Sequence, residues 1–272
     1  MKITVIPHGG LCNRLNNILS AISYIRLHPQ DELQMYWVAN SECNSPLGDL
    51  FLPIPGVTLF EQARERLLLA IPKKRLLFIP QLLREFVFDY QFTDRDNSDD
   101  FEKIVSGCRN VFVCHTNRFW KDPDEGRCMT SEVFVPRPEI QAEINRVCSV
   151  FKNRNSVGLH IRRTDNDSSI GHSPIAVFEK KIEDELSSDP DSVFYLATDD
   201  PDVKAHFRSL YGDKIVSPDF ELRRDSQDGI RDAVIDLYCL GKTDKIYGSF
   251  ASTYSTFAAS LYHRPIEIID VQ

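Results

Sequence analysis

From residue 156 onward the chain repeats one pattern, in which a short apolar segment is followed by a longer amphipathic one. The apolar segments predict strands at 156–161, 192–200, 214–217, 244–250 and 266–270. Apolar residues that recur every three or four positions predict helices at 175–186, 201–211, 230–243 and 252–262. Strands that alternate with helices are typical of parallel βαβ units in a doubly wound sheet.

The first half begins in the same way but is less regular. It predicts strands at 2–7, 33–40 and 109–117 and helices at 13–27 and 137–151, the last with Pro138 near its first turn. Residues 41–51 and 121–128 read as loops, and residues 61–105 show no clear period. A chain of 272 residues has room for two domains. We therefore expect an α/β protein with two Rossmann-like lobes, 1–150 and 151–272.

The composition indicates which classes of binding partner are excluded and in which cellular compartment the protein is expected. With 32 basic and 40 acidic residues the net charge is -8, which argues against a general nucleic-acid or anionic-membrane binder. No stretch approaches the 18 or so apolar residues that span a bilayer, and the start does not read as a signal peptide. Seven cysteines without paired spacing indicate reduced thiols and a cytoplasmic protein. The histidines have no zinc-ligand spacing to a cysteine, so no metal site is expected.

Two adjacent arginines follow the strand at 156–161. Arg162 and Arg163 could be a solvated pair, or could pair with Asp165. Guanidinium groups also suit diphosphate oxygens, and neighbours can converge on one ligand only where a strand has ended. Ligands of doubly wound sheets bind at that edge. The sequence thus favours an anion site here.

Polar residues also follow the next strands. Ser249, Ser252, Thr253 and Ser255 could cap a helix, and a helix start beside two arginines is also a ready anion site. At 199–200 an aspartate pair precedes the helix that opens with Pro201. One of the pair is expected to cap that helix, which leaves the other for a ribose or base.

Asp236 lies among apolar residues on a helix that should be buried. A buried carboxylate needs partners, and a guanine edge, an arginine, a backbone amide or an ordinary salt bridge would serve. The turn HGGLCNRLNN matches neither GxGxxG nor the P-loop. Its glycines let a ligand approach the backbone, with Asn13 and Arg14 at the helix start.

Together these blocks resemble the fucosyltransferase superfamily of nodulation and α-1,6-fucosyltransferases and protein O-fucosyltransferases. The segments HIRRTD, YLATDD and AVIDLYCLGKTDKIYGSFASTYS resemble the three signatures in order, and HGGLCNRLNN resembles the N-terminal turn. The resemblance covers most of 156–262 and about 20 N-terminal residues. It implies a GT-B arrangement of two lobes across a cleft, and an inverting reaction that needs no metal or other cofactor.

The resemblance also implies roles for individual residues. The donor, typically GDP-fucose, would be held by Gly10, Asn13, Arg14, His160, Arg162, Arg163, Asp199, Asp236, Ser252 and Thr253. Of these, the arginines and the helix start would hold the diphosphate, and the two aspartates the nucleoside. Asn13 and Arg14 would lie near the transferred sugar. The acceptor would be a hydroxyl of a glycan, and the oligomeric state is left open.

The chain departs from the α-1,6 enzymes at one position. Those enzymes carry a glutamate, the presumed base, ten positions after the histidine of the first signature, where this chain has Ile170. Either Asp165, Asp167 or the nearby His172 removes the acceptor proton, or the enzyme works without a clear base. Rival hypotheses are another donor such as UDP-xylose or a GDP-hexose, a non-catalytic nucleotide- or glycan-binding protein, and an arginine-dependent phosphatase or phosphotransferase.

Overall fold

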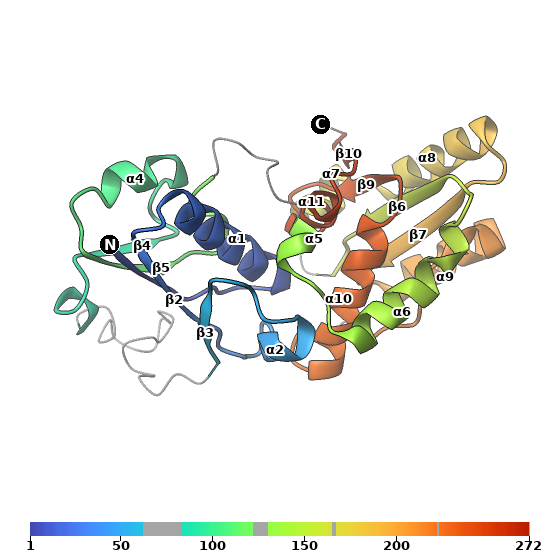
Figure 1. Ribbon diagram of the computed structural model, residues 1–272. Helices are drawn as coiled ribbons and strands as arrows, with labels where there is room; N and C mark the ends of the chain where they lie inside the picture. The colour runs from blue at the N-terminus through green and yellow to red at the C-terminus, as the bar shows by residue number, and fades with distance from the viewer. Residues whose placement is uncertain (62–82, 122–129, 165–166, 222, 272) are drawn as a thin grey trace. The chain divides into compact units, whose positions relative to one another are not determined.

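A computed structural model describes residues 1–61, 83–121, 130–164, 167–221 and 223–271. The chain forms two compact units, each built on a five-stranded parallel sheet (Figure 1). One unit comprises Met1–Cys128 with Arg224–Gln227, and the other Met129–Arg223 with Asp228–Gln272. The α/β class with two Rossmann-like units, expected from the sequence, is confirmed.

The first sheet has the strand order β3-β2-β1-β5-β4. Its strands are β1 (Lys2–Val5), β2 (Glu32–Tyr36), β3 (Thr58–Phe60), β4 (Tyr90–Thr93) and β5 (Asn110–Cys114). Its helices are α1 (Leu11–Leu27), α2 (Leu47–Leu50) and α4 (Phe101–Ile104), preceded by a 3-10 turn at Ser98–Asp100. Apolar residues of α1 at helical spacing, including Leu15, Ile18 and Ile22, are buried.

The second sheet has the order β10-β9-β6-β7-β8. Its strands are β6 (Ser156–Ile161), β7 (Val193–Thr198), β8 (Ile215–Val216), β9 (Lys245–Ser249) and β10 (Ile266–Ile269). The helices are α5 (Thr130–Val133), α6 (Pro138–Cys148), α7 (Asp167–His172), α8 (Ile175–Ser188), α9 (Pro201–Tyr211), α10 (Gln227–Gly241) and α11 (Thr253–Leu261). Two 3-10 turns, Ser149–Phe151 and Gly212–Lys214, follow α6 and α9.

Helices cover both faces of the second sheet because its strands are apolar on both faces. Val157 and Leu159 of β6 belong to a core with residues of α8 and α9. Gly158, which points the other way, lies against α10, where a Cβ would be 2.7 Å from Leu240 and from Thr243. All six residues of β6 are buried, as expected of a central parallel strand.

The elements expected after residue 156 are all present, with ends shifted by a few residues. Pro138 and Pro201 are the first residues of α6 and α9. Expecting only loop at 41–51 was wrong, because α2 lies there, and β4 and α4 lie in the segment without a clear period. The division between the units falls after residue 128, whereas the expected lobe boundary was near 150, so α6 belongs to the second unit.

Two expectations from composition concern the whole chain. None of the helices in the described residues is long and apolar enough to cross a membrane. The six cysteines within the described part of the chain form no disulfide, and Cys128 lies outside that part.

The contact between α10 and α11 yields a stability prediction. A Cβ on Gly241 would lie 2.6 Å from the backbone oxygen of Ala258, which cannot rotate away. We expect Gly241→Ala to lower the free energy of unfolding by about 1–3 kcal/mol, the usual cost of overpacking. A denaturant titration measures this. Gly171→Ala is the control, because its Cβ would meet no described atom within 4 Å. Equal midpoints for wild type and Gly241→Ala would contradict the packing.

Candidate functional site

The carboxyl ends of β6 and β9 lie side by side in the middle of the second sheet. The chain continues from β6 to β7 on one side, while β9 lies on the other, so the connections diverge at this pair of strands. In doubly wound sheets, ligands bind at such a switch point. The Oγ of Ser249 joins the two ends, since it accepts from the backbone N of Arg162 (3.1 Å) and donates to the carbonyl of His160 (3.0 Å).

The adjacent arginines follow β6 directly but have different surroundings. Arg162 is half-buried, and its backbone is held by Ser249. The guanidinium of Arg163 donates to the carbonyls of Ile170 (3.3 Å) and Ser173 (2.5 Å), so it holds the end of α7. Among the described residues, the acceptors of this fork are backbone carbonyls and not carboxylates.

Asp199 fixes the loop that carries the arginines. It directly follows β7, and its carboxylate accepts from the backbone N of Arg163 (2.8 Å) and from the hydroxyl of Thr164 (2.7 Å). The neighbouring Asp200 caps α9 by accepting from the backbone N of Asp202 and of Val203. One aspartate of the pair is thus a helix cap, as expected, and the other shapes the loop.

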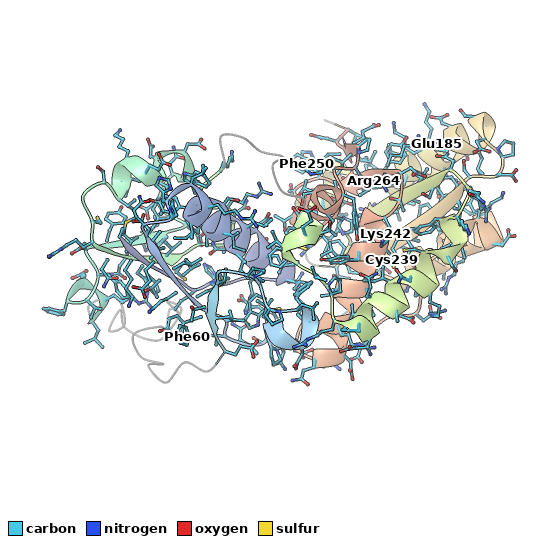
Figure 2. The ribbon with its side chains drawn as sticks, in the orientation of Figure 1. Phe60, Glu185, Cys239, Lys242, Phe250 and Arg264 are labelled. Atoms are coloured by element: carbon cyan, nitrogen blue, oxygen red, sulfur yellow. The ribbon has the colours of Figure 1, made fainter. Side chains whose placement is uncertain are left out.

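Ser173 anchors α7 to the carboxyl ends of β9 and β10. Its hydroxyl donates to the carbonyl of Ile269 (2.6 Å) and accepts from the backbone N of Phe250 (2.8 Å). Phe250, labelled in Figure 2, comes directly after β9. Its carbonyl accepts from the hydroxyl of Ser169 (2.6 Å). Nothing in the sequence pattern marked Ser169 and Ser173, although both are fully buried.

Helix α11 begins at Thr253, shortly after β9 ends at Ser249. Ser252 is its N-cap residue, and its hydroxyl accepts from the backbone N of Tyr254 (3.4 Å). The capping role expected for Ser252 is therefore confirmed. Thr253 is the first residue of the helix. Backbone N–H groups of a first turn lack intrahelical partners and favour anions.

A series of buried polar side chains in contact with one another begins at His160, at the end of β6. The ring of His160 stacks on Tyr254 with centroids 5.0 Å apart, and the hydroxyl of Tyr254 donates to Asp236 (2.9 Å). The other oxygen of Asp236 accepts from the hydroxyl of Tyr195 (2.7 Å). Burial raises the pKa of Asp236 to about 6, although both phenols lower it. The sequence indicated a buried carboxylate here but not its tyrosine partners.

Two buried polar atoms at the end of β6 have no hydrogen-bond partner within the described residues. They are the Nδ1 of His160 and the Nε of Arg163. Burial lowers the pKa of His160 to about 4, so its ring is neutral near pH 7. Unpaired buried donors and acceptors are uncommon, so both atoms are candidates for contact with a ligand or water.

The candidate bases differ in their surroundings. Asp165 lies outside the described residues, and Asp167 is an exposed residue at the start of α7. Ile170 is 40% exposed on the same helix. His172 ends it, with its Nδ1 2.9 Å from a carboxylate oxygen of Asp270 and its ring stacked on Phe250. In the described part of the chain, no group of three His, Cys, Asp or Glu side chains could hold a metal ion.

The glycine turn of the first unit has the local geometry expected of it, but Arg14 differs from expectation. Gly9 has φ +85°, and Gly10 is the N-cap residue of α1. The amide of Asn13 lies against Gly9. Arg14 was expected near a sugar, yet it is fully buried and donates to the carbonyls of Gly9 and Val38 and to Asn40, each at 2.7 Å. These hydrogen bonds of the buried guanidinium fix the glycine turn.

Comparison with solved structures shows which proteins share this fold. Fucosyltransferase NodZ from Bradyrhizobium matches with a TM-score of 0.65 and 18% identity, over 99% of this chain and 94% of that one. Arabidopsis thaliana FUT1 in complex with GDP matches with a TM-score of 0.63 and 14% identity, over 98% of this chain and 69% of that one. POFUT1 in complex with GDP matches with a TM-score of 0.55 and 11% identity, over 98% of both chains.

Comparison of sequences is narrower. The Nodulation protein Z of Bradyrhizobium diazoefficiens is 29% identical over 85 residues, which make up 30% of this chain and 23% of that protein. No family model matches. The chain thus resembles the fucosyltransferase superfamily, in fold over nearly its whole length and in sequence over 85 residues.

Proposed function

We propose that this protein is an inverting, metal-independent glycosyltransferase that moves fucose from GDP-fucose to a hydroxyl of a glycan. The observation that carries the proposal is the switch point of the second sheet, with Arg162, the start of α11 and two buried polar atoms that have no partner among the described residues. The fold supports the donor, because related structures are described as GDP complexes and one NodZ structure as soaked with GDP-fucose.

The diphosphate would lie between Arg162 and the first turn of α11. Arg162 offers a permanent positive charge, and Ser252 and Thr253 offer backbone N–H groups and hydroxyls. The unpaired Nε–H of Arg163 would gain an acceptor from the same anion. The backbone of Arg162, the hydroxyl of Ser252 and the guanidinium of Arg163 already have hydrogen bonds within the chain, which favours a preorganised site.

The nucleoside would lie toward the ends of β6 and β7. His160 would use its unpaired Nδ1 there, next to Asp199. Because both oxygens of Asp236 are taken by tyrosines, we propose that this carboxylate acts through Tyr254, which stacks on His160. It would position the residues that line the nucleoside site and would not contact the nucleoside itself.

The chemical difficulty of the reaction lies in the leaving group. As the bond between the anomeric carbon and the diphosphate oxygen breaks, its electron pair passes to the β-phosphate. The acceptor oxygen bonds to the opposite face of the sugar and gives its proton to a base. Donors directed at the developing charge stabilise the transition state, and one charge-assisted hydrogen bond contributes about 1.5–3 kcal/mol.

A binding and turnover panel tests the proposed function. We expect GDP and GDP-fucose to raise the melting temperature more than UDP or UDP-xylose, with EDTA present throughout. GDP release should then depend on added soluble oligosaccharides. A preference for UDP-sugars or another GDP-hexose would move the assignment to a different donor. Binding without turnover would indicate a non-catalytic protein, and release of inorganic phosphate a phosphatase.

Removal of Arg162 tests the anion site. We expect Arg162→Ala to fold normally and to lose about 10- to 1,000-fold in transfer, since it removes one or two charge-assisted bonds to phosphate. Calorimetry with GDP and the rate of GDP release measure both effects. Arg146→Ala is the matched control, because Arg146 forms an exposed ion pair with Glu143 on α6. Near-normal transfer by Arg162→Ala would count against the site.

A further inference from the structure

Phe250 lies between strand β9 and helix α11, and both polar groups of its backbone are bound by serine hydroxyls. Its N–H donates to Ser173 (2.8 Å), and its carbonyl accepts from Ser169 (2.6 Å). Both serines are fully buried, and all three residues belong to the second unit. The chain is therefore held at the point where it passes from the end of β9 to the start of α11.

The segment that carries the serines is itself attached to the outer strand of the sheet. Ser173 directly follows α7, and its hydroxyl also donates to the carbonyl of Ile269 at the end of β10 (2.6 Å). The backbone N of Val271 donates to the carbonyl of His172 (3.0 Å). The ring of His172 stacks on the ring of Phe250, with centroids 4.2 Å apart. Because α7 is bonded to β10, it is a fixed support for the main chain of Phe250.

The residue after Phe250 has an unfavourable backbone conformation. Ala251 has φ +51°, in the left-handed region that residues other than glycine rarely adopt. Its methyl group cannot form the local hydrogen bond that helps asparagine to adopt this conformation. Such a conformation persists only where the surrounding structure imposes it. The two serine bonds act on the residue immediately before Ala251, so they help to impose it.

The conformation of Ala251 determines how α11 begins. Ser252, the next residue, is the N-cap, and the helix starts at Thr253. A change of φ at residue 251 would rotate everything that follows it, including the first turn of α11. This first turn is the part of the helix that we propose binds the diphosphate.

Ser173 also holds a second part of the proposed anion site. Its backbone carbonyl accepts from the guanidinium of Arg163 (2.5 Å), whose Nε has no partner among the described residues. One buried residue thus connects the loop after β6, the turn after β9 and the end of β10. These three strands are neighbours, and ligands of doubly wound sheets bind at their carboxyl ends.

We propose that Ser169 and Ser173 are positioning residues of the donor site, which hold the turn at Phe250 in the conformation that presents the start of α11 to the diphosphate. This inference rests on the proposed function and extends it to two residues that need not contact the donor. Without the serine bonds, Ala251 would relax toward a more favourable φ. Part of the binding free energy of the diphosphate would then be used to restore the turn.

A purely structural role of the serines would have a different consequence. Their removal would lower the melting temperature without changing the GDP affinity of the folded protein. Ser217 is a matched control, because its buried hydroxyl donates to the carbonyl of Leu196 (2.8 Å) and its carbonyl accepts from Arg208, as that of Ser173 does from Arg163. Ser217 follows β8, the outer strand on the other side of the sheet.

Calorimetry with GDP tests the proposal on three serine variants. We expect Ser173→Ala to weaken GDP binding by about 4- to 100-fold, because it removes two hydrogen bonds that each contribute about 2- to 10-fold. Ser169→Ala removes one such bond and should weaken GDP binding by about 2- to 10-fold, a test that remains if Ser173→Ala does not fold. Ser217→Ala should leave GDP affinity unchanged. Unchanged affinity in Ser169→Ala, or an equal loss in Ser217→Ala, would overturn the proposal.

A substitution at Ala251 separates positioning from stability. Glycine adopts positive φ without the cost that alanine incurs, which is about 5- to 30-fold in population. We therefore expect Ala251→Gly to leave the GDP affinity of the wild type nearly unchanged and to recover most of the affinity lost in Ser169→Ala. Additive effects of the two substitutions, with no recovery in the double variant, would refute the positioning role.

Failure of this inference can be told from failure of the proposed function. A wild-type protein that binds neither GDP nor GDP-fucose would refute the proposed function, and this inference with it. A wild type that binds GDP, with Ser169→Ala and Ser173→Ala of equal affinity to it, would refute the inference alone.

Discussion

Two side chains at the ends of neighbouring strands fix the backbone that presents the arginines. Ser249 accepts from the backbone N of Arg162, and Asp199 accepts from the backbone N of Arg163. The loop after β6 is therefore bonded to β9 on one side and to β7 on the other. Two like charges can stay adjacent at this point because the backbone is held there, and an anion can then be bound without reorganising the loop.

The ionisable groups discussed above divide into those held by protein partners and those that we propose contact the ligand. Asp236 is almost entirely buried and accepts from a tyrosine hydroxyl, so we propose that it supports the site indirectly. Arg14 is likewise buried and fixes the glycine turn of the first unit. Arg163 belongs partly to both groups, since its fork holds α7 while its Nε stays unpaired among the described residues. In a protein of net charge -8, an anion site must be local, and we propose that Arg162 and the start of α11 supply it.

The regular part of the sequence predicted its structure well because strong apolar periodicity leaves few alternatives. The strands and helices after residue 156, the helix starts at Pro138 and Pro201, and the caps at Asp200 and Ser252 follow from local chemistry. Partners could not be predicted in the same way, since they come from distant segments. Asp236 and Tyr195, for instance, are 41 positions apart.

The irregular part of the sequence did not predict the contact between His8 and Asp94. Asp94 lies in a segment without a clear period, directly after a strand of four residues. A histidine before a glycine turn forms no recognisable motif. Its contact with Asp94 becomes visible only in the folded sheet, where the ends of β1 and β4 come close together. Local pattern identifies elements and caps, whereas a contact such as that of His8 with Asp94 depends on the strand order.

A crystal structure of the protein with GDP bound tests the central claim most directly. The account predicts both phosphates in contact with the Arg162 guanidinium and the first backbone N–H groups of α11, at the carboxyl ends of β6 and β9. A diphosphate bound elsewhere, with Arg162 directed away from it, would contradict the account.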